Sequence, residues 1–293
     1  MLMNNITVTD VRHCPGDSAF LIDDGVTSIL YDTGFAFTGE KIAKNVKAVL
    51  GDRTLNYIFL THSHYDHALG APYIKREFPH CRIVAGEYAA RIFQKPSAKS
   101  VMRELDQKFA ATCGITEYED LIDDICVDIS VNDGDIVTAG DMSFKVISLP
   151  GHTRCSVAYY LEKEKLLLSC ETLGVFDGES TVVPSYLIGY GTTIKSIKKA
   201  QELDIEAMLV PHMGLIGRDK ARFYLKAAKI SAVETCEEII AILKGGGSHD
   251  DAVEFFKNKF YHGAIADAYP IDAMLLNTNI MVSLIEREFL SPN

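Results

Sequence analysis

The sequence has no tryptophan, no long apolar run and no cluster of basic residues. The missing tryptophan excludes no class of protein. No apolar stretch approaches the length of a membrane-spanning helix, and the N-terminal residues show neither the basic nor the apolar region of a secretory signal, so we expect a cytoplasmic protein with no membrane partner. The 40 acidic residues outnumber the 29 basic ones, and the net charge of −11 argues against nucleic acid as a partner.

Cysteine is present, but not in a pattern that holds a metal or a disulfide framework. The seven cysteines are odd in number and scattered, without the paired spacing of a thiolate zinc site. We therefore expect them to be reduced and mostly buried. The chain of 293 residues is 47% hydrophobic and 24% charged, which is typical of a globular protein with one large domain and an appendage.

Strand and helix signals alternate along most of the chain. Short β-branched or alternating runs at 6–11, 18–23 and 27–34 predict an antiparallel meander. Apolar spacing predicts a helix over 39–50 that stops at Gly51, and similar strand signals return in the second half. Two β-rich halves, each followed by a helix, indicate two packed sheets with helices outside them.

From Arg218 onward, helical spacing replaces the strand signals. Ser248 with Asp251 three residues later predicts the capped start of a second helix, and Pro270 lies where the first turn of a third helix could begin. The apolar faces of these helices can pack on the rest of the protein, roof a site or form a homodimer, and the sequence does not rank these roles.

The motif THSHYDH occupies residues 61–67, directly after an apolar run. His62 and His64 are two residues apart in an extended segment, so their side chains point to the same side, and Asp66 and His67 follow where the chain begins to turn. Imidazole and carboxylate groups in this arrangement can bind one cation and face a second one beside it. Such a pattern should arise by chance in roughly one in a thousand chains of this composition, so surface polarity explains it poorly.

Two further histidines follow strand-like runs, His152 in SLPGHT and His212 in LVPHMG. A lone histidine is more often structural than a metal ligand, but the shared strand-end context raises the case for both. Together, the candidate motifs resemble those of the metallo-β-lactamase superfamily over roughly residues 5–215, in the order Asp32 in YDTG, THSHYDH, His152 in PGHT, Glu171 in SCETLG and His212 in VPHMG.

The resemblance implies an α/β fold, a four-layer αββα sandwich at 1–220, with a C-terminal helical appendage at 221–293. It implies that the first metal is bound by His62, His64 and His152, and the second by Asp66, His67 and His212. Asp32 would hold the histidine loop in position rather than bind a metal. An Asx-type turn before Thr33 is an equally good reading of Asp32.

Glu171 departs from the family pattern, which usually has aspartate as the carboxylate that bridges the two metals. Glutamate keeps the charge and the ligand atoms but moves them by roughly 1.5 Å, about one covalent bond. We expect Glu171 to bridge or contact a metal. It could also serve as an acid or base beside the metals, or lie exposed at a strand end, while the preceding Cys170 is expected to be a small buried hydrophobe.

Histidine and carboxylate ligands suit two divalent ions, with zinc the simplest choice and iron or manganese as alternatives. Two cations about 3.5 to 4 Å apart would make a bridging hydroxide available near neutral pH and polarise the bond under attack. The resemblance therefore implies a hydrolase that cleaves an ester-like bond, a thioester, lactone or phosphodiester, in a small molecule. Asp66 is also a candidate to accept a proton during catalysis.

Substrate contacts are predicted at Arg154, which replaces a residue of the usual third motif, and at Tyr186 and Tyr190 in the stretch after Glu171. Arginine can pair with a carboxylate or phosphate, and a tyrosine hydroxyl can stabilise an oxyanion. Ordinary surface salt bridging and packing are the competing roles. Two alternatives to the hydrolase stay open, a metal-binding scaffold without efficient hydrolysis and an iron-dependent oxygenase of the same fold.

Overall fold

The structure is a computed structural model that describes residues 2–3 and 5–291. The chain divides into two compact units, which interleave along the sequence. Unit 1 comprises Met1–Ser148 and Val157–Ser169, and unit 2 comprises Leu149–Ser156 and Cys170–Asn293. The boundary expected at residue 220 falls two residues into a long helix that begins at Arg218, and this division of the chain stays a prediction.

Unit 1 contains a seven-stranded sheet in the same order as the sequence. Its strands are β1 (Leu2–Met3), β2 (Ile6–Asp10), β3 (Phe20–Asp23), β4 (Ser28–Tyr31), β5 (Tyr57–Phe59), β6 (Arg82–Gly86) and β7 (Ile129–Val131). The first four are antiparallel, of which β2 to β4 are the predicted meander, and β4 to β7 are parallel. Every residue of β3 and β4 is buried, which is typical of strands covered on both faces.

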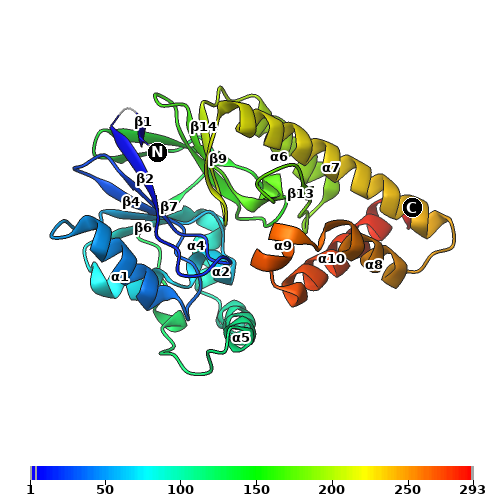
Figure 1. Cartoon of the computed structure of the whole chain (residues 1–293), viewed down its shortest axis with the longest axis horizontal. Helices are drawn as coiled ribbons and strands as arrows, with labels where there is room; N and C mark the ends of the chain where they lie inside the picture. The colour runs from blue at the N-terminus through cyan, green and yellow to red at the C-terminus, as the bar shows by residue number, and fades with distance from the viewer. Residues whose placement is uncertain (1, 4, 292–293) are drawn as a thin grey trace. The chain divides into compact units, whose positions relative to one another are not determined.

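Helices of unit 1 lie between these strands in the sequence. They are α1 (Gly39–Leu50), α2 (Tyr65–Ala68), α3 (Ala71–Glu77), α4 (Glu87–Phe93) and α5 (Pro96–Thr112), with a 3₁₀ turn η1 (Ile122–Asp124). The predicted helix over 39–50 is confirmed, and Gly51 ends it with a φ of 62°, a left-handed conformation that glycine adopts without strain. Figure 1 shows α1 beside the strands of this unit.

A second set of antiparallel strands in unit 1 packs on the first sheet. These strands are β8 (Ile136–Ala139), β9 (Met142–Ser148), β10 (Val157–Leu161) and β11 (Leu166–Leu168). The rings of Phe59, Phe144 and Tyr159 join the two layers, with the Phe59 centroid 5.1 Å from that of Phe144 and 4.6 Å from that of Tyr159. The Tyr159 hydroxyl donates to the Leu60 carbonyl at 2.8 Å. This contact places the residue before the histidine motif against the opposite layer.

Unit 2 combines short strands with most of the long helices. Its elements are a 3₁₀ turn η2 (Glu171–Leu173), β12 (Val175–Phe176), β13 (Val182–Val183), α6 (Tyr190–Gln201), β14 (Ala207–Val210), β15 (Gly214–Gly217), α7 (Arg218–Lys244), α8 (His249–Phe260), α9 (Gly263–Ala268), α10 (Ile271–Ile285) and a π-helical turn η3 (Glu286–Leu290). In Figure 1, α8 and α10 lie alongside the long α7. The expected C-terminal helical region is therefore present.

The start of α8 confirms the capping prediction. The Ser248 hydroxyl accepts from the Asp251 amide at 3.1 Å, and the Asp251 carboxylate accepts from the Ser248 amide at 2.8 Å. Aspartate thus replaces the usual glutamate without loss of the reciprocal bonds. Sequence periodicity missed α9 and the short strands β12, β13 and β15, because segments of two to six residues carry too few positions to show a period. Among the described residues, no helix has both the length and the apolar character needed to cross a membrane.

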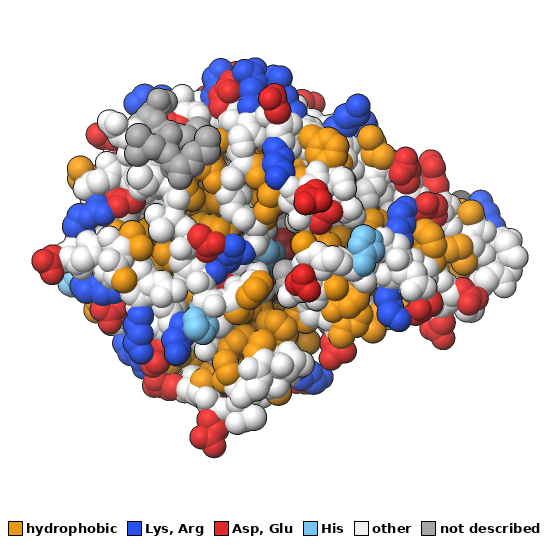
Figure 2. Space-filling model, in the orientation of Figure 1, with side chains coloured by type: hydrophobic (Ala, Val, Ile, Leu, Met, Phe, Trp, Pro, Cys, Tyr) orange, Lys and Arg blue, Asp and Glu red, His pale blue; other side chains and the backbone are white. Residues whose placement is uncertain are grey.

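A cluster of aromatic side chains in unit 1 lies next to the histidine motif. Phe35 and Phe37 are buried at its base, and Tyr65, Phe109 and Tyr118 pack against them while keeping some exposure. The Phe35 centroid lies 5.6 Å from that of Tyr65 and 4.8 Å from that of Phe109. On the face drawn in Figure 2, hydrophobic side chains gather over α5, the helix that carries Phe109.

One buried carboxyl holds this cluster together. Asp106 has no exposed surface, and its oxygens accept hydrogen bonds from the Tyr118 hydroxyl and, at 2.8 Å, from the Ala36 amide. Burial disfavours the charged carboxylate and raises the pKa of Asp106 to about 7, although both hydrogen bonds act in the opposite direction. Asp106 therefore titrates close to neutral pH.

Candidate metal centre

The histidine motif begins where β5 ends in unit 1. Leu60 continues the strand pairing by donating to the Val84 carbonyl at 2.9 Å, and the Thr61 carbonyl accepts from the Val157 amide at 2.9 Å. The chain then turns into α2. The His67 and Ala68 amides donate hydrogen bonds to the His64 carbonyl, and these bonds form the first turn of the helix. This strand-to-helix turn gathers the side chains of the motif at one end of the sheet.

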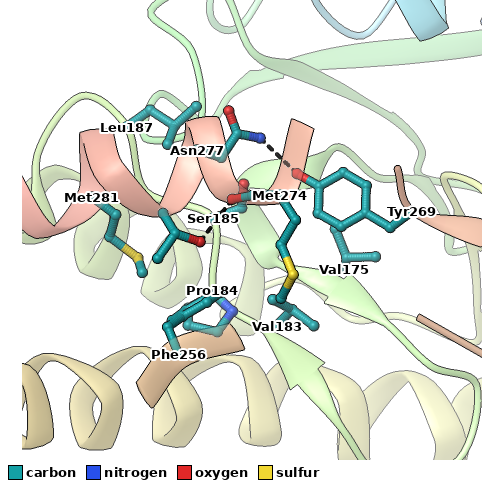
Figure 3. A pocket seen from close by; sticks show the side chains of 11 residues that line it. Val175, Val183, Pro184, Ser185, Leu187, Phe256, Tyr269, Met274, Asn277 and Met281 are labelled. Atoms are coloured by element: carbon teal, nitrogen blue, oxygen red, sulfur yellow. Dashed lines mark hydrogen bonds between the residues drawn. The ribbon is translucent and has the colours of Figure 1, made fainter. Parts of the chain in front are cut away.

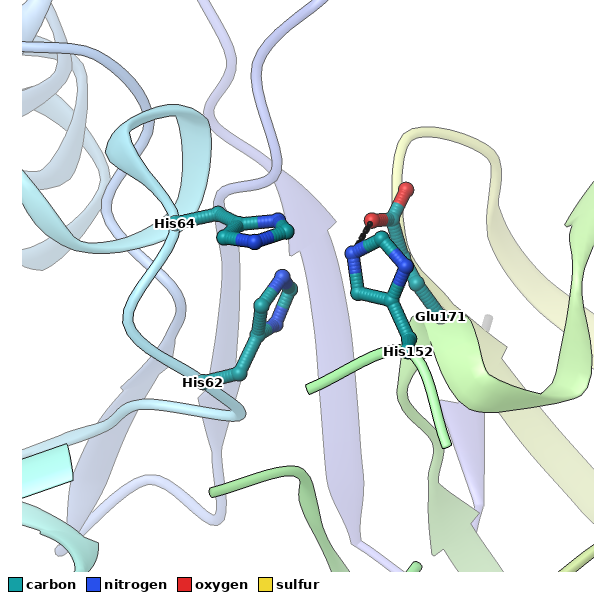
Figure 4. A group of neighbouring side chains, drawn as sticks. All are labelled: His62, His64, His152 and Glu171. Atoms are coloured by element: carbon teal, nitrogen blue, oxygen red, sulfur yellow. Dashed lines mark ion pairs between the residues drawn. The ribbon is translucent and has the colours of Figure 1, made fainter. Parts of the chain in front are cut away.

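The three imidazoles of the motif lie together. The His62 ring centroid is 4.6 Å from that of His64 and 4.1 Å from that of His67. His62 and His67 have no exposed surface, whereas His64 and Asp66 are partly exposed. The Asp66 carboxylate lies 3.5 Å from Nε2 of His67. Unit 1 thus brings together four of the predicted ligands, and Figure 4 shows two of them, His62 and His64, on the loop after β5.

Asp32 holds this loop in position through hydrogen bonds to His67 and Thr61. Its Oδ2 lies 2.8 Å from Nδ1 of His67 and accepts from the Ser18 hydroxyl at 3.0 Å, while Oδ1 accepts from the Thr61 amide at 2.9 Å. A carboxylate can only accept, so Nδ1 of His67 carries a proton and Nε2 is the ring atom left to face a metal. Asp32 itself has a φ of 52°, which aspartate tolerates better than most residues.

Gly70 brings the next helix close to the same loop. A Cβ at this position would lie 1.9 Å from the Thr33 carbonyl oxygen, and the Thr33 amide and hydroxyl both donate to the His67 carbonyl, at 2.7 and 2.9 Å. Only glycine permits this approach of backbone to backbone. The segment after Asp32 therefore clamps the end of the histidine motif.

Unit 2 contributes a second set of candidate ligands. His152 lies in the loop before β10 and is 1% exposed, and its Nδ1 lies 2.7 Å from the Ser185 hydroxyl. Its Nε2 lies 2.9 Å from Oε2 of Glu171, an ion pair that Figure 4 draws. His212 follows β14 in a left-handed conformation with a φ of 61°. This conformation is uncommon outside glycine and is a frequent feature of functional sites.

Glu171 stands between the two histidines of unit 2. While Oε2 faces His152, Oε1 lies 3.1 Å from Nε2 of His212. The carboxylate is 5% exposed and belongs to the η2 turn directly after Cys170, which is fully buried. The two oxygens of one carboxylate are thus directed at two different imidazoles, and the alternative of an exposed strand-end carboxylate does not describe this position.

The predicted substrate contacts have different surroundings. Arg154 is exposed, and it forms no hydrogen bond or ion pair with any residue that the structure describes. Tyr186 has no exposed surface, and burial raises its pKa well above the ordinary value, so its position favours packing. Tyr190 is partly exposed, and its ring lies 5.5 Å from Phe289 and 5.8 Å from Tyr186.

Sequence reasoning missed the residues that orient the histidines. Ser185 directly precedes the predicted substrate contact Tyr186, and its hydroxyl lies 2.7 Å from Nδ1 of His152. Ser18 and Thr61 were not predicted either. The Ser18 hydroxyl donates to Asp32, and the Thr61 hydroxyl lies 3.0 Å from Nδ1 of His62, the next residue. Four of the seven cysteines are buried, as expected for the majority, but Cys113 and Cys126 are exposed.

Comparison with known proteins identifies a family. The sequence model described as the metallo-beta-lactamase superfamily matches residues 15–212. Glyoxylase B2 from Dictyostelium discoideum is 32% identical over 133 residues, which cover 45% of this chain and 41% of that protein. Hydroxyacylglutathione hydrolase from Bradyrhizobium sp. (strain ORS 278) is 29% identical over 120 residues, 41% of this chain and 34% of the relative. The matches therefore span less than half the length of these curated relatives.

Solved structures agree on the fold. A metallo-beta-lactamase family protein from Thermus thermophilus superposes with a TM-score of 0.62 at 18% identity, covering 92% of this chain and 88% of that chain. An archaeal metallo-beta-lactamase superfamily protein from Sulfolobus tokodaii gives a TM-score of 0.60 at 15% identity, covering 97% of this chain and 99% of that one. At these identities the likeness establishes the fold alone.

Proposed function

The chain belongs to the metallo-beta-lactamase superfamily, and we propose that it is a metal-dependent hydrolase that cleaves a thioester bond in a small molecule. The observation that carries this proposal is the position of Glu171, whose two carboxylate oxygens face Nε2 of His152 and Nε2 of His212. A carboxylate shared in this way suits a bridge between two metal ions. The choice of a thioester follows the relatives named hydroxyacylglutathione hydrolase, since an acyl group on the sulfur of glutathione is a thioester.

We assign two ligand sets that share Glu171. By the motifs of the family, the first set would be His62, His64, His152 and Glu171, and the second Asp66, His67, Glu171 and His212. Each residue offers one nitrogen or carboxylate oxygen. Both sets contain only imidazole and carboxylate donors, which suit zinc, iron or manganese, and zinc is the simplest choice.

The residues present fit such ions in the orientation of their rings as well as in their type. Nδ1 of His67 is engaged by the Asp32 carboxylate, and Nδ1 of His152 lies 3.2 Å from the Ser185 carbonyl and 2.7 Å from its hydroxyl. These contacts leave Nε2 of each ring directed at a carboxylate, Asp66 or Glu171. A fixed tautomer with a free Nε2 lone pair is what a metal-binding histidine needs.

Two divalent cations bound there would lower the pKa of a water molecule between them and polarise the thioester carbonyl. Hydrolysis then requires the water oxygen to bond to the carbonyl carbon, the carbon–sulfur bond to break, and a water proton to pass to the sulfur, which leaves as a thiol. Asp66 is partly exposed and lies beside His67, so we assign it the role of accepting that proton. The exposed Arg154 is a candidate to bind a carboxylate of the substrate.

The experiment combines elemental analysis with a panel of generic substrates. We expect close to two divalent ions per chain and hydrolysis of an acyl thioester, with lactone and bis-phosphodiester substrates turned over more slowly. His62→Ala should lose metal and at least about a hundredfold in activity, since it removes a direct ligand. His262→Ala is the matched control, because His262 is exposed and its side chain contacts only the Lys259 carbonyl among the described hydrogen-bond partners.

Several outcomes would replace the proposal. Bound metal without turnover of any substrate would favour a scaffold. One bound iron with oxygen consumption would favour the oxygenase. Faster cleavage of the lactone or the phosphodiester would keep the hydrolase and change its substrate. Homodimer formation through the C-terminal helices stays a prediction, for which light scattering is the direct measurement.

A further inference from the structure

Helix α10 uses one side to close the core of unit 2. Met274, Asn277 and Met281 on this side line a cavity of about 10 Å³ against β12 and β13. Figure 3 shows these side chains around the cavity, together with the hydrogen bond of 2.6 Å from the Asn277 amide to the Tyr269 hydroxyl. Such a volume holds about one water molecule, so this side of α10 is packed and leaves no room for a ligand.

The other side of α10 borders an open groove of about 320 Å³. Its lining consists of Leu187, His249, Leu276, Asn279, Ile280, Ser283, Leu284 and Arg287. Leu276 is 46% exposed and Ile280 is 40% exposed, although both are large apolar side chains one helical turn apart. Adjacent exposed apolar residues commonly mark a binding surface, and the volume is in the range of small-molecule sites.

Arg287 is the one arginine or lysine among the residues that line this groove. Arg287 belongs to the π-helical turn that continues α10, a rare conformation that is frequent at functional sites. The acids on either side of it have other partners: Glu286 lies 3.1 Å from Nδ1 of His249, which also lines the groove, and Glu288 accepts from the Tyr190 amide at 3.3 Å. The side chain of Arg287 makes no hydrogen bond or ion pair within the described part of the chain. Its guanidinium is therefore available to a ligand.

We propose that this groove binds an apolar carboxylate, with the alkyl chain along Leu276 and Ile280 and the carboxylate on Arg287. Guanidinium and carboxylate match in a planar, two-bond geometry, whereas the groove offers no second arginine or lysine for a phosphate. A groove of about 320 Å³ is at the small end of the range of small-molecule sites, so octanoate is a suitable probe.

The wall of the groove is continuous with the loop that orients His152. Leu187 lines the groove, and its amide donates to the Gly151 carbonyl at 2.9 Å, directly before His152. Two residues earlier, the Ser185 hydroxyl contacts Nδ1 of the same histidine at 2.7 Å. A molecule bound in the groove beside Leu187 would therefore contact the segment that positions His152.

The test uses the absence of native tryptophan. Leu276→Trp places a single fluorophore at the edge of the groove, and titration with octanoate should shift its emission in a saturable way. Octanol, which lacks the charge, should bind at least about tenfold more weakly, since a hydrogen bond to a charged group is worth about 1.5 to 3 kcal/mol. Isothermal titration of the unmodified chain with octanoate should give the same affinity.

Variants of the arginine locate the bound molecule. In the Leu276→Trp background, Arg287→Gln should weaken octanoate binding at least about tenfold, and Arg287→Lys should restore part of it. Arg222→Gln is the matched control, because Arg222 is an exposed arginine of α7 that does not line the groove, and this variant should bind octanoate normally.

Three results would overturn the proposal. Equal binding of octanol would show that no carboxylate is recognised. Octanoate binding that survives Arg287→Gln would place the molecule elsewhere, for example on the metals. Emission that shifts with protein concentration but not with octanoate would show that a second copy of the chain covers Leu276. If the tryptophan variant fails to fold, calorimetry of wild type, Arg287→Gln and Arg222→Gln decides the question.

Discussion

Replacing Asp32 with asparagine tests how the histidine motif is held. Asparagine has the same shape and tolerates the left-handed backbone at this position, so the change adds little strain. Its oxygen can still accept from the Thr61 amide, but its NH₂ group then faces Nδ1 of His67 and the Ser18 hydroxyl. Because two N–H groups cannot share one hydrogen bond, His67 should move its proton to Nε2.

A protonated Nε2 has no lone pair for a metal. Loss of a carboxylate that orients a metal-binding histidine typically lowers metal affinity 10- to 100-fold, which corresponds to about 1.4 to 2.8 kcal/mol. We expect Asp32→Asn to weaken the ion on His67 by this factor and to leave the ion on His62 and His64 closer to its original affinity. The free energy of unfolding of the metal-free chain should fall by about 1 to 3 kcal/mol.

The assay is competition of zinc between the protein and a coloured chelator, with unfolding by urea measured in parallel. Asp17→Asn is the matched control. Asp17 is also fully buried and accepts hydrogen bonds from the Thr38 hydroxyl at 2.6 Å and the Cys14 amide at 2.8 Å, but it contacts no histidine side chain. This control should lose stability without loss of zinc affinity. Unchanged affinity in Asp32→Asn, or an equal loss in both variants, would refute the reasoning.

Three further predictions concern other parts of the molecule. Glu171→Gln should lower turnover at least about a hundredfold and reduce the metal content, while Glu171→Asp should retain part of both; a fully active glutamine variant in a steady-state assay would contradict the bridging role. The Asp106 carboxyl binds its proton more tightly in the folded chain, where its pKa is about 7, than in the unfolded chain, where it is about 3.9, so its contribution to stability is present below about pH 4 and is lost as the pH rises towards 7. Asp106→Asn should remove this decline in urea unfolding curves recorded between pH 4 and 8, and an unchanged slope would argue against the raised pKa. Gly70→Ala should destabilise the fold by more than about 3 kcal/mol because of the contact with the Thr33 carbonyl, whereas Gly191→Ala in an open helical position should be neutral or stabilising by up to about 1 kcal/mol; similar melting temperatures for the two would show that the backbone can yield at Gly70.

Local patterns carried most of the fold prediction. The meander of β2 to β4 and the helix over 39–50 were predictable because alternation and helical spacing repeat over enough residues to be recognised. The capped start at Ser248 was visible for a similar reason, since both partners lie within one helical turn. The short strands β12 and β13 could not be predicted from the sequence, because two residues show no periodicity and the pairing of the strands depends on the surrounding unit.

The candidate ligands were also visible locally, whereas their support was not. Histidine, aspartate and glutamate at strand ends can be recognised by residue type and spacing. Four of the candidate ligands lie within the six residues 62–67. The oxygens that orient them come from positions distant in the chain, such as Ser185, which lies 33 residues from His152. Hydroxyl groups are common on any surface, so nothing in the sequence distinguishes this serine from the others.

The sequence by itself determined the family, the order of the motifs and the kinds of atoms available to bind a metal, because these depend on residue type and short-range spacing. Only the tertiary structure decided that the two oxygens of Glu171 face different histidines, that Asp32 fixes the tautomer of His67, and that Arg287 lies at the end of an apolar groove. Those properties are distances and directions between residues far apart in the chain, and they exist only once the backbone between them has folded.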